Sequence, residues 1–281
     1  MALRSYFLSP DSEPQLATPD EVHEAIRGLK VSKAPGPNGI PKRALKHLPK
    51  RVVSLLARIF NAVLRTHHFP QTWKHARVIS ILKPGKDPTL PSSYRPISLL
   101  DTIGKLFEQI LLARILHVVK ECGLLRDEQL GLRPRHSTSL QLARLVERIT
   151  RRKETPRRSF PRRRQNLRYC LDRFPLYKLT LLNFPSYIVH TISSYLRGRT
   201  FEASFQTATS SRRGMRAGVG QGGLISPVIF SLYVNDMPPT LELRRVGPLR
   251  GRHGLHSHVP KADAACQLPG VITQRPSTMV E

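Results

Sequence analysis

Apolar residues recur at helical spacing near the start of the chain. Between residues 19 and 29 they fall on one face of a helix, because they are roughly three or four positions apart. Thr18 stands at the expected N-cap, and Glu21 completes a capping box with it. We expect this helix to end before residues 33–40, a stretch rich in proline and glycine.

The pattern then changes from helical to extended and back. Residues 50–66 carry apolar side chains at helical spacing. Residues 73–82 are rich in β-branched and apolar side chains and predict a strand, followed by a turn at residues 83–88. Residues 94–100 predict a short extended return, and residues 103–120 a long amphipathic helix.

Arginine-rich and irregular segments interrupt the order further along. Residues 140–149 and 226–233 each predict a helix, whereas residues 151–173 show no period and are dominated by arginine. Periodicity also fades after Leu241. The predicted divisions are an N-terminal segment (1–18), two ordered regions (19–150 and 176–240), an arginine-rich segment (151–175) and an irregular tail (241–281).

The composition indicates a polyanionic partner. Forty-six Lys and Arg residues face 19 Asp and Glu residues, a formal charge of +27, which most simply fits nucleic acid. Three widely spaced cysteines predict no disulfide framework and no zinc site. No apolar run reaches the roughly 18–20 residues that span a bilayer, and the first residues do not resemble a signal peptide. We therefore expect an intracellular protein without a membrane partner, whether nuclear or cytoplasmic.

The segment with the most information is residues 218–227, which read Gly-Val-Gly-Gln-Gly-Gly-Leu-Ile-Ser-Pro. Three other segments precede it: Lys-Ala-Pro-Gly-Pro-Asn-Gly-Ile at 33–40, Ile-Ser-Ile-Leu-Lys-Pro-Gly-Lys at 79–86 followed by Ser-Tyr-Arg-Pro-Ile-Ser at 93–98, and Gly-Leu-Arg-Pro-Arg-His-Ser-Thr at 131–138. In this order they resemble reverse transcriptases of non-LTR retrotransposons of the LINE and jockey-like kind.

The resemblance implies an α+β fold of the right-hand polymerase type. Residues 19–150 would form the fingers and early palm, and residues 176–240 the part of the palm that carries the glutamine loop. The usual upstream endonuclease and the thumb are expected to be missing. By resemblance, RNA and DNA would be the partners, as template and primer, and Mg²⁺ the cofactor.

Four residues are candidates for nucleotide or template binding by the same resemblance: Lys83, Arg95, Gln221 and Gly222. Lys83 and Arg95 lie on neighbouring segments of the predicted hairpin, and a point charge beside a bidentate fork suits a triphosphate. Gln221 lies between small residues that let a nucleotide or base approach. The alternative interpretation stays open: two surface cations, and a glycine-rich turn that starts a helix.

The carboxylates of a polymerase site are missing from their expected places. Template-directed polymerisation uses two divalent cations about 3.5–4 Å apart, held by carboxylates. The resemblance implies one aspartate before the glutamine loop and an Asp-Asp pair after it, yet the chain contains no Asp-Asp pair. The candidate before the loop, Asp172, lies in the arginine-rich segment. We therefore expect no catalytic or metal-binding residues and disrupted metal-site strands in the palm.

A shift of the reading frame accounts for both gaps. Read one base later, the codons of residues 161–171 permit Leu-Asp-Val-Ala-Lys-Thr-Phe-Asp-Thr-Val-Trp, and those of residues 249–254 permit Tyr-Ala-Asp-Asp-Thr-Ala. The leading hypothesis is a reverse-transcriptase fragment that is inactive as written. Two alternatives remain: a basic nucleic-acid-binding remnant without enzymatic activity, and a pseudogene product without a stable function.

Overall fold

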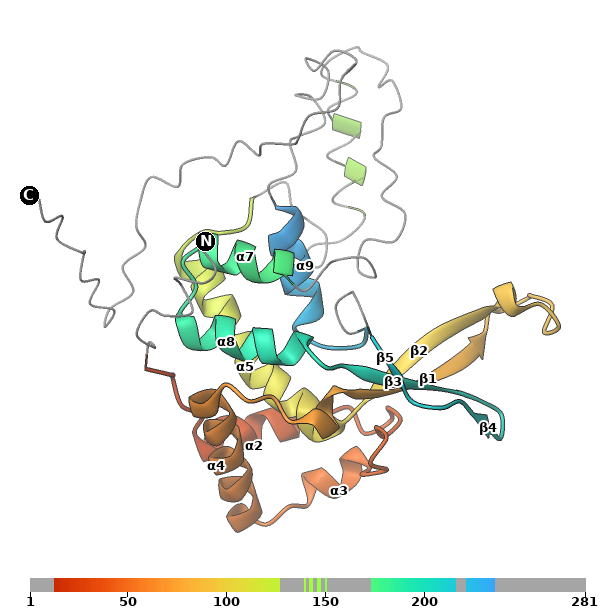
Figure 1. Cartoon of the computed structure of the whole chain (residues 1–281), viewed down its shortest axis with the longest axis horizontal. Coiled ribbons are helices and arrows are strands. Elements are labelled where there is room, and N and C mark those ends of the chain that lie inside the picture. Colours follow the sequence, from red (N-terminus) through yellow and green to blue (C-terminus); the bar gives the residue numbers. More distant parts are fainter. Residues whose placement is uncertain are drawn as a thin grey trace, which may run out of the picture.

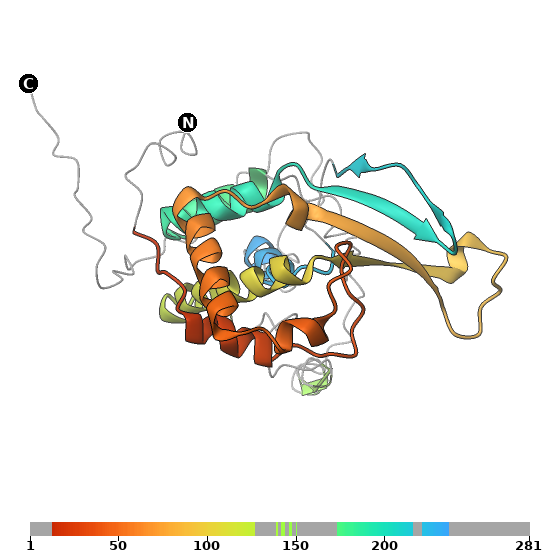
Figure 2. The ribbon, with the colours of Figure 1, turned by 90° about the horizontal axis from the view of Figure 1, so that it is seen from below.

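The computed structural model describes residues 13–126, 173–215 and 221–235, together with six positions between 139 and 150. Its helices gather in one body, and a sheet extends from the side of that body as an arm (Figures 1 and 2). A mixed sheet packed beside helices is an α+β arrangement, so the predicted fold class is confirmed at that level. The assignment to fingers, palm and thumb stays a prediction.

The helices follow the apolar periodicity of the sequence. They are α2 (Pro19–Arg27), α3 (Lys42–Lys46), α4 (Lys50–Thr66), α5 (Thr102–Glu121), α7 (Arg173–Leu181), α8 (Ser186–Leu196) and α9 (Ser226–Val234). The helices predicted over residues 50–66, 103–120 and 226–233 are confirmed to within a residue at each end. Helix α2 begins where predicted and ends well before residue 33.

An aromatic cluster joins helices from distant parts of the chain. Its rings lie 5.1–6.0 Å apart between centroids and come from Phe60, Phe69, Trp73, Phe107 and Tyr195. All five side chains are buried. Edge-to-face packing of this kind adds to the stabilisation from apolar burial. The cluster therefore fixes α4, α5 and α8 around one core.

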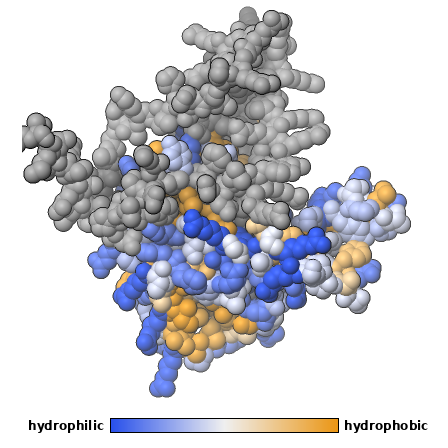
Figure 3. Space-filling view, viewed as in Figure 1, coloured by the Kyte–Doolittle hydropathy of each residue, from blue (hydrophilic) through white to orange (hydrophobic). Residues whose placement is uncertain are grey.

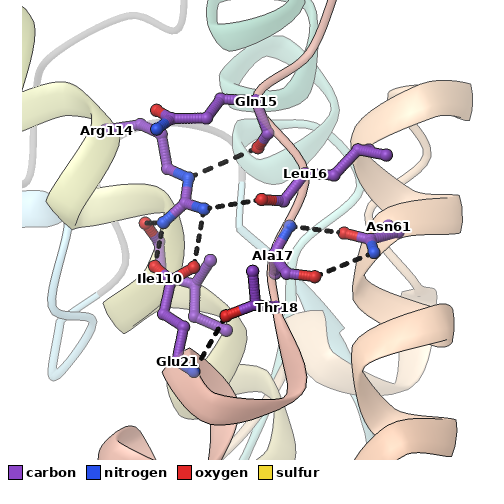
Figure 4. A network of polar contacts seen from close by, with 8 residues as sticks. All are labelled: Gln15, Leu16, Ala17, Thr18, Glu21, Asn61, Ile110 and Arg114. Carbon is purple, nitrogen blue, oxygen red and sulfur yellow. Dashed lines mark hydrogen bonds and ion pairs between the residues drawn. The ribbon is translucent and has the colours of Figure 1, made fainter.

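Thr18 caps α2 as predicted, but the prediction that the Glu21 side chain completes a capping box is wrong. The Thr18 hydroxyl accepts from the Glu21 backbone N–H at 3.2 Å. The Glu21 carboxylate instead accepts two hydrogen bonds from Arg114 of α5 (Figure 4). A buried guanidinium offers two charge-assisted bonds, which outweigh the single backbone bond of a capping box.

Arg114 also holds the segment before α2. Its guanidinium donates to the carbonyls of Gln15 and Leu16 at 3.4 and 3.2 Å (Figure 4). Asn61 of α4 completes the attachment, because its side-chain amide accepts from the Ala17 N–H at 2.7 Å and donates to the Ala17 carbonyl at 3.0 Å. Residues 15–17 are thus tied to α4 and α5.

The sheet is mixed and contains the predicted hairpin. Its strands are β1 (His75–Leu82), β2 (Tyr94–Leu100), β3 (Thr200–Phe205), β4 (Ala208–Thr209) and β5 (Arg213–Gly214). β1 pairs with β2 in antiparallel fashion, which confirms the hairpin, and with β3 in parallel fashion. The strand order is β2-β1-β3-β4, and β5 also pairs with β3. Short helical turns, η1 (Gln71–Lys74) and η2 (Pro91–Ser93), precede β1 and β2.

Two predicted boundaries need correction. The strand expected from Trp73 begins at His75, because Trp73 lies in η1 and turns its ring into the aromatic cluster. Gly104 lets α5 approach that ring, since a Cβ there would lie 2.9 Å from the Trp73 Cβ. Helix α7 begins at Arg173, so the boundary placed after residue 175 falls inside a helix.

Several predicted features lie outside the described residues. These are the motif at 131–138, the segments 151–172 and 236–281, and the glycines at 218 and 220. The six described positions between 139 and 150 are all helical, which agrees with the helix predicted at 140–149.

Two findings concern membrane-spanning helices and the cysteines. Among the described residues, no helix has both the length and the apolar character that crossing a membrane would need. Cys122 takes part in a disulfide bond. The expectation drawn from cysteine spacing is corrected at this position, because distance along the chain does not report distance in the fold.

Candidate functional site

Lys83 and Arg95 lie at the outer part of the β1–β2 hairpin. The Lys83 ammonium donates to the Ser92 carbonyl at 2.6 Å, and the Lys83 N–H donates to the Ser93 carbonyl at 2.9 Å. Arg95 is exposed and pairs with Ile81 across the hairpin. Figure 2 shows this part of the hairpin far from the helical body. Both cations are therefore held by the hairpin at the end of the arm.

The glutamine loop rests on the hairpin nearer its base. The Gln221 side-chain amide donates to the Pro96 carbonyl at 3.4 Å. Gly222 adopts a φ of +85°, and a Cβ there would lie 2.9 Å from the Ser98 carbonyl oxygen. Glycine is therefore needed twice over, for its backbone conformation and for its close approach to β2.

The structure brings the four predicted residues to one hairpin but not to one point. Gly222 lies against Ser98, whose side chain shares a face of the sheet with Val78. Side chains alternate along a strand, so Arg95 projects from the opposite face. Gln221 and Gly222 thus lie together against β2, whereas Arg95 is on the face opposite Ser98 and Lys83 lies further out along the hairpin.

A buried polar cluster behind the glutamine loop was not predicted from the sequence. Glu108 of α5 is 1% exposed, and its carboxylate accepts from the Leu224 N–H. A Cβ on Gly223 would overlap the Tyr195 hydroxyl and lie 3.0 Å from both a Glu108 oxygen and the Ser226 hydroxyl. The available signal was an acidic residue in the apolar run Leu-Phe-Glu-Gln-Ile of a predicted core helix.

Burial dominates the electrostatics of this cluster. Desolvation raises the pKa of Glu108, although the N–H groups of Leu224 and Ile225 and the charges of Arg199 and Lys105 oppose the rise. Burial also raises the pKa of the Tyr195 hydroxyl, and the negative charge of Glu108 raises this pKa further. The Arg199 guanidinium lies over the Tyr195 ring, 4.5 Å from its centroid.

The proline- and glycine-rich segment packs against the start of α5. A Cβ on Gly36 would lie 2.5 Å from the Leu100 carbonyl oxygen, so the backbone approaches β2 closely. The Asn38 amide donates to the Asp101 carboxylate at 2.7 Å, and that carboxylate also accepts from the Ile103 N–H at 2.8 Å. Burial raises the pKa of Asp101. This segment is therefore an architectural link to the hairpin.

Three lysines surround this link. Lys42 is 9% exposed, and desolvation lowers its pKa, followed by the charges of Lys105 and Lys33. Desolvation also lowers the pKa of Lys105, with Glu108 opposing the change. No ion pair within the described ranges neutralises Lys42. Figure 3 shows hydrophilic side chains gathered between the lower helices and the base of the hairpin, and an apolar area over those helices.

The described carboxylates do not fit a pair of Mg²⁺ ions. Glu21, Asp101 and Glu108 accept the hydrogen bonds given above, and Glu202 is paired with Arg77 at 2.9 Å and with His75 at 3.3 Å. In the part of the chain that the structure describes, no three acidic, histidine or cysteine side chains are grouped to hold a metal ion. Asp172 lies outside that part, as do the segments that a frame shift would change.

Comparison with known proteins identifies relatives. No family model matches the chain. A probable RNA-directed DNA polymerase from transposon BS of Drosophila melanogaster is 37% identical over 222 residues, which cover 78% of this chain and 24% of that protein. The chain is homologous to RNA-directed DNA polymerases of non-LTR retrotransposons. The recognition made from the four motifs is thus confirmed.

Other relatives carry similar names. The probable RNA-directed DNA polymerase from transposon X-element of Drosophila melanogaster is 37% identical over 226 residues, and the RNA-directed DNA polymerase from the mobile element jockey of the same species is 36% identical over 228 residues. The matched residues are 78% and 79% of this chain and, in both cases, 24% of the relative. The chain therefore spans about a quarter of the length of these polymerases.

Proposed function

We propose that this chain is a reverse-transcriptase fragment that binds RNA and DNA and does not polymerise as written. The observation that carries the proposal is its homology to RNA-directed DNA polymerases over 78% of its length. The glutamine loop, seated on β2 next to the Pro96 carbonyl, supports a nucleotide- or template-facing role for Gln221 and Gly222. Lys83 and Arg95 would contact phosphates from the hairpin.

Nucleic-acid binding follows from the positive surface. Phosphate attraction needs cations and little else, so it survives the loss of a metal site. Lys42 supports it, because its ammonium lies near the charges of Lys33 and Lys105 and would be stabilised by an anion that approaches it. Such binding would be largely independent of base sequence and would weaken as salt rises.

The proposed lack of polymerase activity rests on ligand chemistry. Mg²⁺ requires hard oxygen ligands, and the sequence places arginines where the resemblance implies aspartates. Cations repel Mg²⁺ and offer no ligand oxygen. When bound, such ions would activate the attacking hydroxyl and stabilise the leaving pyrophosphate. A fragment without their ligands would keep nucleic-acid affinity and lose the chemistry.

Two measurements test the proposal. Fluorescence anisotropy with single-stranded RNA should show affinity that falls by about tenfold or more between low and physiological salt. Absent or salt-independent binding by a folded sample would refute the binding part. Isothermal titration with Mg²⁺ should show no tight site in the chain as written, and a site in a variant in which residues 161–171 and 249–254 carry the frame-shifted sequence. A tight site in the chain as written would refute the ligand argument.

A binding protein without enzymatic activity is the second candidate. The described core and the three lysines favour this candidate, because neither depends on the aspartate pair that a polymerase site would need. A cooperative thermal melt by circular dichroism, together with RNA binding in the absence of Mg²⁺, would support this candidate. The absence of a melt would instead favour a product without a stable fold.

A further inference from the structure

Helix α9 lacks a cap of its own. Its N-cap residue, Ile225, makes no side-chain hydrogen bond to the first turn. The first N–H groups of a helix have no partner within the helix, and a buried helix start needs one from elsewhere. The glutamine loop runs directly into this start, so whatever satisfies these N–H groups also fixes the loop.

Glu108, on another helix, binds the backbone immediately before α9. Its carboxylate accepts from the N–H of Leu224, the residue before the N-cap, and the nearby N–H of Ile225 also favours the charged form of the carboxyl group. A negative charge at a helix N-terminus also interacts favourably with the helix dipole. The contact joins residues 116 positions apart in sequence, so it docks the loop and α9 onto α5.

Gly223 makes this contact possible. A side chain at this position would overlap the Tyr195 hydroxyl and crowd Glu108 and Ser226. The loop is therefore held on two sides: Gly223 lies against the Glu108 cluster, and Gly222 lies against β2. Gln221 is the next residue, so its position on β2 depends on the same contacts.

We propose that Glu108 is a positioning residue that anchors the start of α9 to α5 and thereby holds Gln221 against β2. The role of Gln221 toward nucleotide or template rests on the proposed function; the anchoring itself does not. Glu108 contacts the backbone of the loop at Leu224, so its proposed role is exercised through the loop. The groups that face its carboxylate are Tyr195 and Ser226, the cations Arg199 and Lys105, and the backbone N–H groups of residues 224 and 225.

Two physical features distinguish this role from ordinary packing. Gln at position 108 would keep the volume of the side chain but lose its charge, so packing alone predicts no change in Glu108→Gln. Burial of the carboxylate is also costly, since desolvation raises its pKa. The glutamine variant should therefore keep its global stability at neutral pH while its loop loosens.

Hydrogen–deuterium exchange of the full chain without nucleic acid is the test. Glu108→Gln should raise amide exchange in residues 221–225 about tenfold or more, because hydrogen bonds to a charged acceptor are lost. Glu121→Gln, an exposed change on the same helix, should leave it unaltered. Unchanged exchange in a folded Glu108→Gln sample would overturn the proposal.

A second readout does not depend on that variant folding. Gly223→Ala should also speed exchange in the loop, and Tyr195→Phe in the same chain should partly reverse this by removing the overlapping hydroxyl. Unchanged loop exchange in a folded Gly223→Ala sample counts against the proposal. A lack of RNA binding would refute the proposed function alone.

Discussion

Replacement of Arg114 by methionine tests whether the chain adopts the described fold. The side chain is 6% exposed, donates twice to the Glu21 carboxylate, and donates to backbone carbonyls of residues 15 and 16. Methionine keeps the apolar stem of the arginine and removes only its donors. The change leaves a partly buried carboxylate and two carbonyls without these partners.

The expected cost is large for a single substitution. Removing one partner of a buried ion pair costs about 3–5 kcal/mol of unfolding free energy. Glu21 is 30% exposed and gains some solvation, so we take the lower end, about 3 kcal/mol. At about 2–4 °C for each kcal/mol, the melting temperature should fall by about 6–12 °C.

Urea unfolding followed by tryptophan fluorescence measures this cost. The chain has one tryptophan, Trp73, and it lies in the aromatic cluster, so its emission reports loss of the core. Arg27→Ala is the matched control, because its pair with Glu24 is 67% exposed on both sides and should be worth at most about 0.5 kcal/mol. An Arg114→Met loss below about 1 kcal/mol, or equal losses in both variants, would refute the reasoning.

Three further predictions concern the link between the proline- and glycine-rich segment and the hairpin. Lys42→Gln should reduce the slope of log affinity for single-stranded RNA against log salt by about 0.7, measured by anisotropy, and an unchanged slope would exclude a phosphate contact. Gly36→Ala should lower the unfolding free energy by about 1–3 kcal/mol, since the Cβ would lie 2.5 Å from a backbone oxygen; an unaltered melt would contradict the close approach. Burial raises the pKa of Asp101, so its stabilising contribution is present below its ordinary pKa and is lost as pH rises through the raised one. The melting temperature of Asp101→Asn relative to wild type should therefore increase from about pH 4 to pH 7, and a difference independent of pH would contradict the assignment.

Local elements could be predicted because their patterns are periodic. Helices α4 and α5 bury a regular apolar stripe, and the two strands of the hairpin are separated by turn-forming residues. Thr18 was identifiable as a cap because its bond to the first turn is local. The four motifs identified the family because their order along the chain is itself part of the sequence.

The contacts that build the site are long-range, and no local pattern encodes them. The hydrogen bond of the Leu224 N–H to Glu108 joins residues 116 positions apart, and that of Gln221 to Pro96 joins residues 125 positions apart. The capping-box prediction failed for the same reason, since the true partner of Glu21 is Arg114, 93 positions away. Side chains alternate along β2, so Arg95 lies on the face opposite Ser98. The sequence did not show that Gly222 contacts Ser98, and so it did not show that Arg95 and the loop are separated.

The measurement that tests the central claim most directly is primer extension on an RNA template with Mg²⁺. The purified chain as written should bind the primer–template, with the salt dependence given above, and add no nucleotides. A polymerase from the jockey element serves as the positive control. Template-dependent extension by the chain as written, abolished by omission of Mg²⁺, would contradict the account.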